Sequence, residues 1–261
     1  MRLVLENFSI AQIANSGQCF RINPLPCSDG NLWTVSALGK ILQIKAISNN
    51  EYIFNCSEEE YYNAWMDYFD LARDYGNIQQ KILSFNDPFL SAAAIYGSGI
   101  RILKQDLWEV IISFIISQRN SIKRIQHILQ KLCRPWDGIF PPPEALADYD
   151  EQKFTELGVG YRARYLTNIV RAANDGALDL NFLKTLDTPS AIDYLRQFHG
   201  IGTKVANCIV LYGLHHMDAF PIDIWMRRII DKYYGGNFDY HKFSQYAGLV
   251  QQYMFFYERN N

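Results

Sequence analysis

The stretch that decides the fold is "AIDYLRQFHGIGTKVANCIVLYGL", residues 191–214. Apolar residues recur at helical spacing on both sides of HGIG, which predicts two helices joined by a tight turn. Gly200 and Gly202 fit such a turn, because glycine tolerates the positive φ angles and the close backbone approach that it requires. The free amides at the start of the second helix would then form a phosphate site. A helical hairpin can also be purely structural, so the turn alone leaves both interpretations open.

A lysine stands at the mouth of the second helix. Lys204 and Cys208 are four residues apart and therefore share one helical face. Downstream, "DAFPIDIWMRRIIDKYYGG" (218–236) places Asp223 ahead of an amphipathic helix, where it is a natural N-cap. A carboxylate at a helix N-terminus stays ionised, and desolvation or a neighbouring positive dipole would lower the pKa of a lysine enough to make its amine a nucleophile. This pair suits attack at a sugar C1′ through a Schiff base. The alternative is a phosphate-contacting lysine beside an aspartate that only caps.

The composition is that of a globular protein, with 261 residues of which 49% are hydrophobic and 20% charged. No window approaches eighteen apolar residues, and the first residues lack the pattern of a secretory signal. We therefore expect no membrane partner and a cytoplasmic location, at the nucleoid if the source is bacterial. The five cysteines are odd in number and contain no C-x-x-C pair. They predict reduced thiols and argue against a zinc or iron–sulfur site, so we expect no metal site.

The net charge of −2 does not favour nucleic-acid binding, but the acidic and basic residues are unevenly distributed along the chain. Residues 51–74 hold seven acids and one base, whereas residues 116–134 hold five bases and no acid. A mildly acidic protein with a locally basic face can bind phosphates, because the electrostatic field near the contact, and not the net charge, determines whether they bind. The alternative for the basic run is a solvated helix face.

The period of the pattern changes once along the chain. Residues 1–55 contain short alternating runs such as "LWTVSAL", "KILQIKAI" and "EYIFN", which predict antiparallel strands. From Ser57, which forms a capping-box pattern with Glu60, the period becomes helical. "FNDPFL" (85–90) is a plausible boundary. The sequence thus predicts an α+β protein, with an antiparallel sheet domain at 1–88 and an all-helical domain at 89–261.

"GIGTKVANC" followed by "AFPIDIW" resembles the helix-hairpin-helix plus Gly-Pro-Asp superfamily of DNA glycosylases, and in particular the 8-oxoguanine DNA glycosylase/AP lyase family. The likeness runs over nearly the full length, through "NSGQCFR", "FIISQRNSIKRI", "LGVGYRARY" and "YAGLVQQYMFF". That ordered series is far more specific than one hairpin. It implies a TATA-binding-protein-like antiparallel sheet domain before a helical domain with the hairpin at about residues 190–215.

The resemblance also implies roles for individual residues. Lys204 is similar to the Schiff-base nucleophile of the family, and Asp223 to its catalytic carboxylate. The residues that resemble the base pocket are Gly17, Cys208, Gln251 and Phe255. Those that resemble DNA-binding positions are Arg119, Asn120, Arg124, Tyr161, Arg162, Gly200, Gly202 and Trp225.

The chemistry of the lesion fits these roles independently. Guanine N7 is a hydrogen-bond acceptor, and oxidation at C8 turns N7 into a donor. A backbone carbonyl at Gly17 would accept from the lesion and repel normal guanine. Gln251 and Phe255 are four apart, so one helical face can offer an amide to the Watson–Crick edge and a ring to stack on. Such a pocket requires the nucleotide to be flipped out of the duplex. Without the family, Phe255 reads equally well as part of an aromatic core.

The sequence departs from the family pattern at two positions. Arg119 stands where the family usually has asparagine, with Asn120 next to it, which puts strict preference for cytosine opposite the lesion in question. Trp225 stands where histidine is frequent, so one phosphate contact is lost or replaced. The cysteine quartet of the iron–sulfur branch is missing after Cys208, which disfavours activities like those of endonuclease III or adenine glycosylases. Lys204 disfavours the alkylbase glycosylases, which usually lack it.

The sequence thus predicts a bifunctional base-excision repair enzyme. It would flip out and excise 8-oxoguanine from duplex DNA and then nick the strand by β-elimination. The alternatives are an alkylpurine DNA glycosylase of the same superfamily and a non-catalytic helix-hairpin-helix DNA-binding protein. We expect no required cofactor, with a monovalent cation at the hairpin as an option, and the family suggests a monomer.

Overall fold

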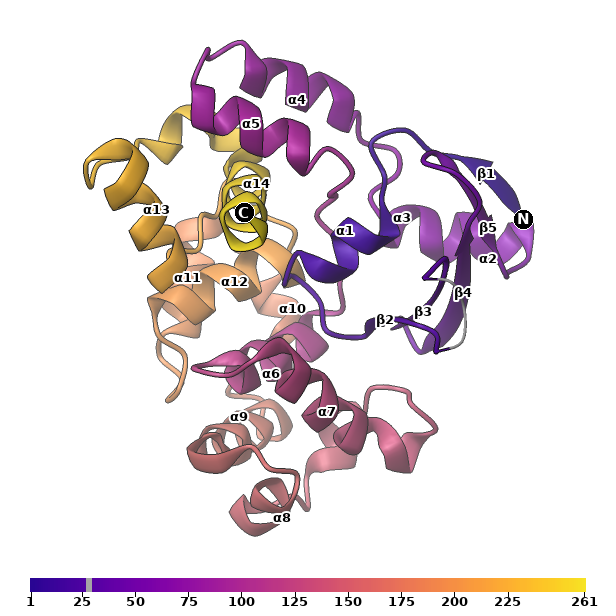
Figure 1. The fold of residues 1–261 in the computed structure, drawn as a ribbon. Coiled ribbons are helices and arrows are strands. Elements are labelled where there is room, and N and C mark those ends of the chain that lie inside the picture. The colour runs from indigo at the N-terminus through magenta and orange to yellow at the C-terminus, as the bar shows by residue number, and fades with distance from the viewer. Residues whose placement is uncertain (27–29) are drawn as a thin grey trace.

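The computed structural model describes residues 1–26 and 30–261. Cys27, in the predicted turn "PLPCSDGN", lies outside the described residues. The first part of the chain forms a five-stranded antiparallel sheet, and most of the remainder is helical, which confirms the predicted α+β class (Figure 1).

The sheet has the strand order β1-β5-β4-β3-β2. Its strands are β1 (Arg2–Val4), β2 (Ile22–Pro24), β3 (Leu32–Ala37), β4 (Lys40–Ala46) and β5 (Glu51–Phe54). The three alternating runs of the sequence are β3, β4 and β5. In β3 every second residue is buried, as period-2 patterning requires. The β3–β4 hairpin turns at Leu38 and Gly39, which both have positive φ, as a two-residue hairpin turn demands.

Of the helices, one precedes the long strands of the sheet and the others follow it. They are α1 (Ile10–Asn15), α2 (Glu58–Glu60), α3 (Met66–Tyr68), α4 (Tyr75–Leu83), α5 (Pro88–Tyr96), α6 (Leu107–Ser117), α7 (Ile122–Cys133), α8 (Glu151–Glu156), α9 (Ala163–Asn174), α10 (Leu180–Leu183), α11 (Thr188–Leu195), α12 (Thr203–Gly213), α13 (Ile224–Tyr234) and α14 (Ala247–Asn260). A π-helical turn at Tyr61–Trp65 joins α2 to α3. The predicted cap is present, because Ser57 Oγ accepts a hydrogen bond from the Glu60 amide at 3.1 Å.

Two apolar cores hold these elements. Buried side chains of the sheet, α1 and the segment 61–69 form one core, and the helices from α4 onward form the other. α6 is buried on nearly every side, and α12 and α14 pack in the same helical core. The two cores overlap along the sequence around residue 88. Tyr75 and Ile82 of α4, before this point, belong to the helical core, and Leu103, after it, belongs to the sheet core. The division at 88/89 stays a prediction.

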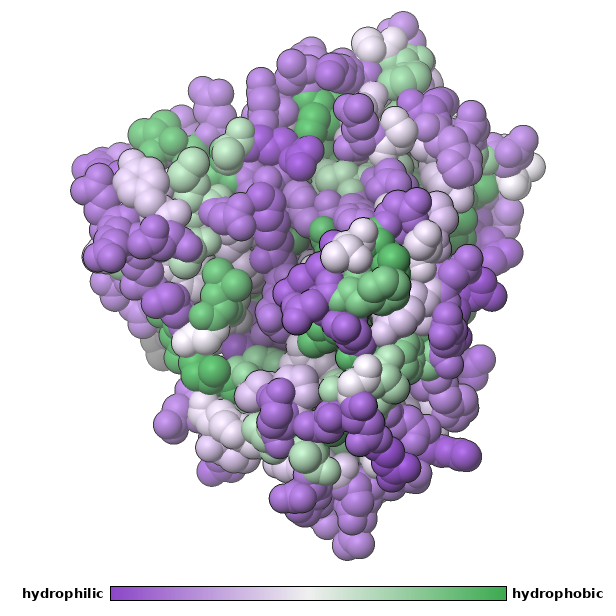
Figure 2. All heavy atoms as spheres, turned by 180° about the vertical axis from the view of Figure 1, so that it is seen from behind, coloured by the Kyte–Doolittle hydropathy of each residue, from purple (hydrophilic) through white to green (hydrophobic). Residues whose placement is uncertain are grey.

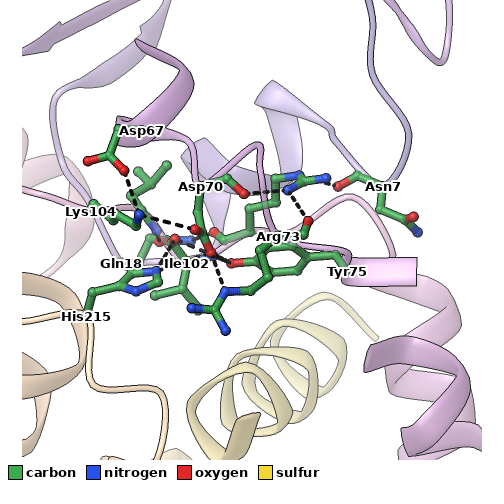
Figure 3. Close-up of polar contacts among 11 residues, drawn as sticks. Asn7, Gln18, Asp67, Asp70, Arg73, Tyr75, Ile102, Lys104 and His215 are labelled. Atoms are coloured by element: carbon green, nitrogen blue, oxygen red, sulfur yellow. Dashed lines mark hydrogen bonds and ion pairs between the residues drawn. The ribbon is translucent and has the colours of Figure 1, made fainter. Parts of the chain in front are cut away.

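A buried carboxylate links the two parts of the molecule (Figure 3). Asp70 is 4% exposed and accepts hydrogen bonds from Arg73 Nε at 2.7 Å and the Tyr75 hydroxyl at 3.0 Å. Lys104 Nζ and His215 Nε2 each lie 3.5 Å from its carboxylate oxygens. The cluster thus joins the end of the first part, the connection before α6 and the loop after α12.

The surface is mixed in character. Figure 2 shows the face opposite to that of Figure 1, where apolar side chains form small separate groups within a largely polar surface. Within residues 1–26 and 30–261, no helix has both the length and the apolar character needed to cross a membrane.

Candidate active site

The hairpin joins α11 to α12 as the sequence predicts. Gly200 has φ +97°, and a Cβ there would lie 2.4 Å from Cγ of Tyr165, so both the backbone conformation and the packing require glycine. Gly202 differs from the expectation: its φ is −87° and a Cβ would meet nothing within 4 Å. The prediction of a positive φ at Gly202 is therefore wrong, because this residue is the extended N-cap of α12 and no longer part of the turn.

The start of α12 carries the lysine. Gly202 is the N-cap residue and has no side chain. The first amides of α12 therefore receive no hydrogen bond from their N-cap residue. Lys204 Nζ lies 5.4 Å from the ring centroid of Phe114, and Lys204 and Cys208 line the same cavity. Burial raises the pKa of the Cys208 thiol, while the neighbouring ammonium of Lys204 acts in the opposite direction. Cys208 is therefore a neutral thiol packed along the lysine.

Asp223 caps α13, as its position in the sequence predicts. Its Oδ1 accepts a hydrogen bond from the Met226 amide at 2.8 Å. The cap uses one carboxylate oxygen and fixes the side chain at the positive end of the helix dipole. Asp223 therefore places a fixed negative charge beside the small cavity between these helices.

One small cavity of about 50 Å³ brings the predicted catalytic and base-pocket residues together. Its lining residues are Ser16, Gly17, Phe114, Lys204, Cys208, Tyr212, Pro221, Asp223, Gln251, Gln252 and Phe255. They come from the segment before β2 and from α6, α12, the loop before α13, and α14. The volume suits a water molecule, which occupies about 30 Å³ in the liquid, and not a purine. A base therefore enters only if a lining side chain moves.

Gly17 and Phe255 lie next to each other at this cavity. Gly17 has φ +83°, and a Cβ there would lie 3.4 Å from Phe255 Cε1. The Gly17 backbone is held by Gln18, whose fully buried amide donates to Ser16 Oγ at 2.9 Å and to the Arg101 carbonyl at 2.8 Å. Phe255 is only partly buried, so its ring has room to move.

A wide groove opens beside the cavity and shares Lys204 and Asp223 with it. Its volume is about 620 Å³. The other lining residues are Ser117, Gln118, Arg119, Asn120, Gly202, Val205, Ile222, Ile224, Trp225, Arg227 and Arg228. Four of the predicted DNA-binding residues, Arg119, Asn120, Gly202 and Trp225, thus lie along one surface. The groove presents three arginines and exposed apolar side chains, of which Ile224 is 68% exposed.

Three other predicted DNA-binding residues are not among those that line the groove. Arg162 is 5% exposed, and its guanidinium donates to the carbonyls of Gln118, Arg119 and Val159. Tyr161 is 54% exposed, and its hydroxyl lies 3.4 Å from the Gln118 carbonyl. Arg124 donates to the Gly158 carbonyl at 2.9 Å. In this structure Arg162 holds the segment in place, and its contact with DNA stays a prediction.

Sequence reasoning missed several residues of the site. Tyr212 continues the spacing of Lys204 and Cys208 by four more residues, so the face of α12 that carries them contained a signal for it. Arg227 and Arg228 follow Trp225 after Met226 and could have been added to the basic positions. Ser16, Phe114 and Gln252 gave no such signal, because they reach the cavity only through packing between distant segments. Among the described residues, no group of three or more His, Cys, Asp or Glu side chains could hold a metal ion.

Comparison with known proteins gives the family. Residues 1–111 match the 8-oxoguanine DNA glycosylase N-terminal domain, and residues 112–250 match the HhH-GPD superfamily base excision DNA repair protein. The chain is similar to an N-glycosylase/DNA lyase of Saccharomyces cerevisiae, with 35% identity over 164 residues, which are 54% of this chain and 44% of the yeast protein. The match thus spans less than half of that relative.

Solved structures match over nearly the whole chain. A structure of MBOgg1 in complex with a low-affinity DNA ligand is 33% identical with a TM-score of 0.90, covering 99% of this chain and 94% of that one. The Clostridium acetobutylicum 8-oxoguanine glycosylase/lyase, in complex with double-stranded DNA containing cytosine opposite 8-oxoG, is 33% identical with a TM-score of 0.88 and covers 98% and 93%. The chain therefore belongs to the 8-oxoguanine DNA glycosylase family of the HhH-GPD base excision repair superfamily.

Proposed function

We propose that the protein is a bifunctional DNA glycosylase and AP lyase that excises 8-oxoguanine from duplex DNA. The observation that carries the proposal is the shared cavity. The cavity brings together groups from distant parts of the chain: the Lys204 amine, the Asp223 carboxylate that caps α13, the Gly17 backbone at positive φ, the Gln251 amide and the Phe255 ring. Family membership supports the same substrate, because the yeast relative is named an N-glycosylase/DNA lyase and the Clostridium 8-oxoguanine glycosylase/lyase is complexed with DNA that contains 8-oxoG.

The reaction follows from the two groups at the mouth of the cavity. The Lys204 ammonium first loses a proton to solvent, and the resulting amine attacks C1′. The C1′–N9 bond breaks with its electron pair leaving on the base, which takes up the proton that the attacking nitrogen releases. The carboxylate of Asp223 stabilises the positive charge that develops on the sugar. Ring opening gives a Schiff base between Nζ and C1′. Loss of a C2′ proton then expels the 3′ phosphate by β-elimination, and hydrolysis of the Schiff base frees the enzyme.

The base-pocket roles belong to the same proposal. Gly17 would offer its carbonyl to the N7–H of the lesion, which normal guanine lacks. Phe255 would stack on the base with Cys208 on the other face, and Gln251 would read the Watson–Crick edge. The small volume of the cavity supports a resting state in which a lining side chain such as the partly buried Phe255 ring must move before a flipped base can enter.

The groove is the proposed path of the DNA backbone. Arg119, Asn120 and Trp225 line it, and the uncapped start of α12 at Gly202 offers amides to a phosphate. Gly200 shapes the hairpin, Tyr161 and Arg162 contact the Gln118 carbonyl, and Arg124 contacts the Gly158 carbonyl.

Three finer points are also proposals. A monovalent cation at the hairpin would be held by backbone carbonyls, the oxygen ligands that hard cations prefer. The Gly200 carbonyl accepts one hydrogen bond, from Gln118 Nε2 at 2.9 Å, which leaves a second lone pair. Action as a monomer and a cytoplasmic location stay predictions.

Borohydride trapping tests the proposal, because it reduces a Schiff base to a permanent cross-link. We expect a covalent adduct with duplex DNA containing 8-oxoguanine, and none when Lys204→Gln is used. A binding module would give no adduct with either protein, which would overturn the catalytic assignment. Parallel duplexes with alkylated purines identify the substrate, since release of alkylated bases alone would contradict the pocket assignment.

A further inference from the structure

Gln18 directly follows the glycine whose carbonyl is proposed to accept a hydrogen bond from the lesion. Its side chain is completely buried and makes three hydrogen bonds. The amide Nε2 donates to Ser16 Oγ at 2.9 Å and to the Arg101 carbonyl at 2.8 Å, and Oε1 accepts from the Leu103 amide at 2.8 Å. Gln18 thus ties the chain on both sides of Gly17 to residues 101–103.

The orientation of the Gln18 amide is unambiguous, because its main-chain partners have fixed polarity. A carbonyl only accepts a hydrogen bond, and an N–H only donates one. Rotation of the amide by 180° would place Oε1 against the Arg101 carbonyl and Nε2 against the Leu103 N–H, so both hydrogen bonds would be lost. The Ser16 hydroxyl agrees with this assignment, since it donates to the Ile13 carbonyl at 2.8 Å and accepts from Gln18.

The segment that holds Gln18 is itself firmly anchored. Arg101 is 6% exposed, and its guanidinium donates to four main-chain carbonyls, those of Glu6, Asn7, Asp70 and Arg73. The Ile102 amide donates to the Tyr75 hydroxyl at 2.9 Å, and Figure 3 shows Ile102 beside Gln18. The support of Gln18 therefore comes from the buried polar cluster that joins the sheet to the helices.

A second glutamine holds the main chain of Gln18. Gln105 Nε2 donates to the Gln18 carbonyl at 2.8 Å. The side chain and the backbone of Gln18 are thus each fixed by residues 101–105. Neither glutamine is among the residues that line the cavity, so both act on a bound base only through Gly17.

The Gly17 carbonyl is available to a ligand. Gly17 lines the cavity, and within residues 1–26 and 30–261 no donor is hydrogen-bonded to its carbonyl. Glycine samples a wider range of backbone angles than other residues, so an unsupported peptide between Gly17 and Gln18 would rotate easily. Such a rotation would exchange the carbonyl for the Gln18 N–H, and a donor would then oppose the N7–H of the lesion.

We infer that Gln18, supported by Gln105, is a positioning residue that holds the Gly17 carbonyl in the orientation in which it accepts from the flipped base. The inference rests on the proposed function and adds to it residues that do not touch the base. An acceptor that is fixed before the base enters costs no ordering entropy on binding.

The test compares two reactions that both use Lys204 but differ in their need for Gly17. One is single-turnover excision of 8-oxoguanine opposite cytosine. The other is strand cleavage at a preformed abasic site, which has no base to contact the Gly17 carbonyl. Gln18→Met keeps the approximate length of the side chain without its hydrogen bonds. We expect excision to slow roughly 5- to 150-fold, the effect of a buried donor without its acceptor, while abasic-site cleavage keeps the wild-type rate.

Gln105→Met removes only the hydrogen bond to the Gln18 carbonyl, and we expect it to slow excision about 2- to 12-fold, again with unchanged abasic-site cleavage. Gln12→Met is the matched control. Gln12 makes the same pair of contacts elsewhere, because its Nε2 donates to the Tyr96 carbonyl at 2.9 Å and its Oε1 accepts from the Gly99 amide at 2.8 Å. Both reactions should keep the wild-type rate in this variant.

Wild-type excision in both Gln18→Met and Gln105→Met would overturn the inference. An equal loss of the two reactions would overturn it as well, because a general structural defect does not distinguish a damaged base from an abasic site. If Gln18→Met does not fold, Gln105→Met still decides. Failure of the wild type to excise 8-oxoguanine at all would contradict the proposed function instead.

Discussion

At the scale of single residues, the two glycines of the hairpin, Gly200 and Gly202, have different roles. Gly200 is required by its positive φ and by Tyr165, whereas Gly202 has an ordinary φ and open space around it. The two glycines look alike in the sequence because each flanks Ile201 in the same motif. Only the first is demanded by sterics. The second leaves the N-terminus of α12 without a competing side chain.

This difference predicts different outcomes for one substitution. Gly200→Ala adds a methyl group at φ +97° and against the Tyr165 ring, and we expect it to lower the free energy of unfolding by about 2–4 kcal/mol. Gly202→Ala serves as the matched control, with an expected cost of at most about 1 kcal/mol. Urea unfolding of both variants measures the difference. Equal destabilisation would contradict the role assigned to Gly200.

At the scale of elements, α12, α13 and α14 each bring one part of the chemistry to the cavity. α12 supplies Lys204 and Cys208, the N-cap of α13 is Asp223, and α14 supplies Gln251 and Phe255. The i, i+4 pairs were predictable because helical geometry alone places such residues on one face. The cap was predictable because aspartate before an amphipathic helix is a local signal. The orientation of each face toward the same cavity was not, because it depends on how the helices pack.

Asp223 combines a structural and a proposed chemical role, and substitution can separate them. Asparagine is as good an N-cap as aspartate, so Asp223→Asn should change the free energy of unfolding by less than about 0.5 kcal/mol. The loss of charge should slow base excision by about 100- to 1,000-fold. Asp223→Ala should lose both, with about 1 kcal/mol of stability removed. Urea unfolding and single-turnover excision measure the two effects; full activity in Asp223→Asn would exclude the electrostatic role.

At the scale of the whole molecule, the sheet and the helices are joined by buried polar contacts as well as by apolar packing. Asp70 gathers Arg73, Tyr75, Lys104 and His215 around one carboxylate (Figure 3). His215 Nε2 lies 3.1 Å from the Ile102 carbonyl as well. Removing its partners would leave the buried Asp70 carboxylate without compensation, so the cluster fixes how the two parts of the chain sit together.

His215 makes the stability of this junction depend on pH. Burial lowers the pKa of His215 below its ordinary value, although Asp70 acts in the opposite direction, with Arg73 and Lys104 reinforcing the decrease. The unfolded chain therefore binds more protons than the folded one below about pH 6.5. The contribution of His215 to stability is present above that pH and is lost as the pH falls through its folded pKa.

His215→Asn removes this titration and keeps the backbone, because asparagine tolerates the φ of +59° at this position. Between pH 7 and pH 5, the variant should lose less of its free energy of unfolding than the wild type, by up to about 1.4 kcal/mol per pH unit. His241→Asn changes an exposed histidine and is the control. Urea unfolding at several pH values measures the slopes, and identical slopes for wild type and His215→Asn would contradict the prediction.

The sequence by itself determined what depends on neighbours along the chain. The helices, the caps at Ser57 and Asp223, the hairpin and the order of the family motifs all follow from local spacing, because backbone geometry and capping act within a few residues. The tertiary structure alone decided what depends on distant residues. The meeting of Gly17 with Phe255, the engagement of the Arg162 guanidinium by backbone carbonyls and the hydrogen bonds of Gln18 with Arg101 and Leu103 are such cases. They arise from packing between elements far apart in the sequence, and no local spacing encodes them.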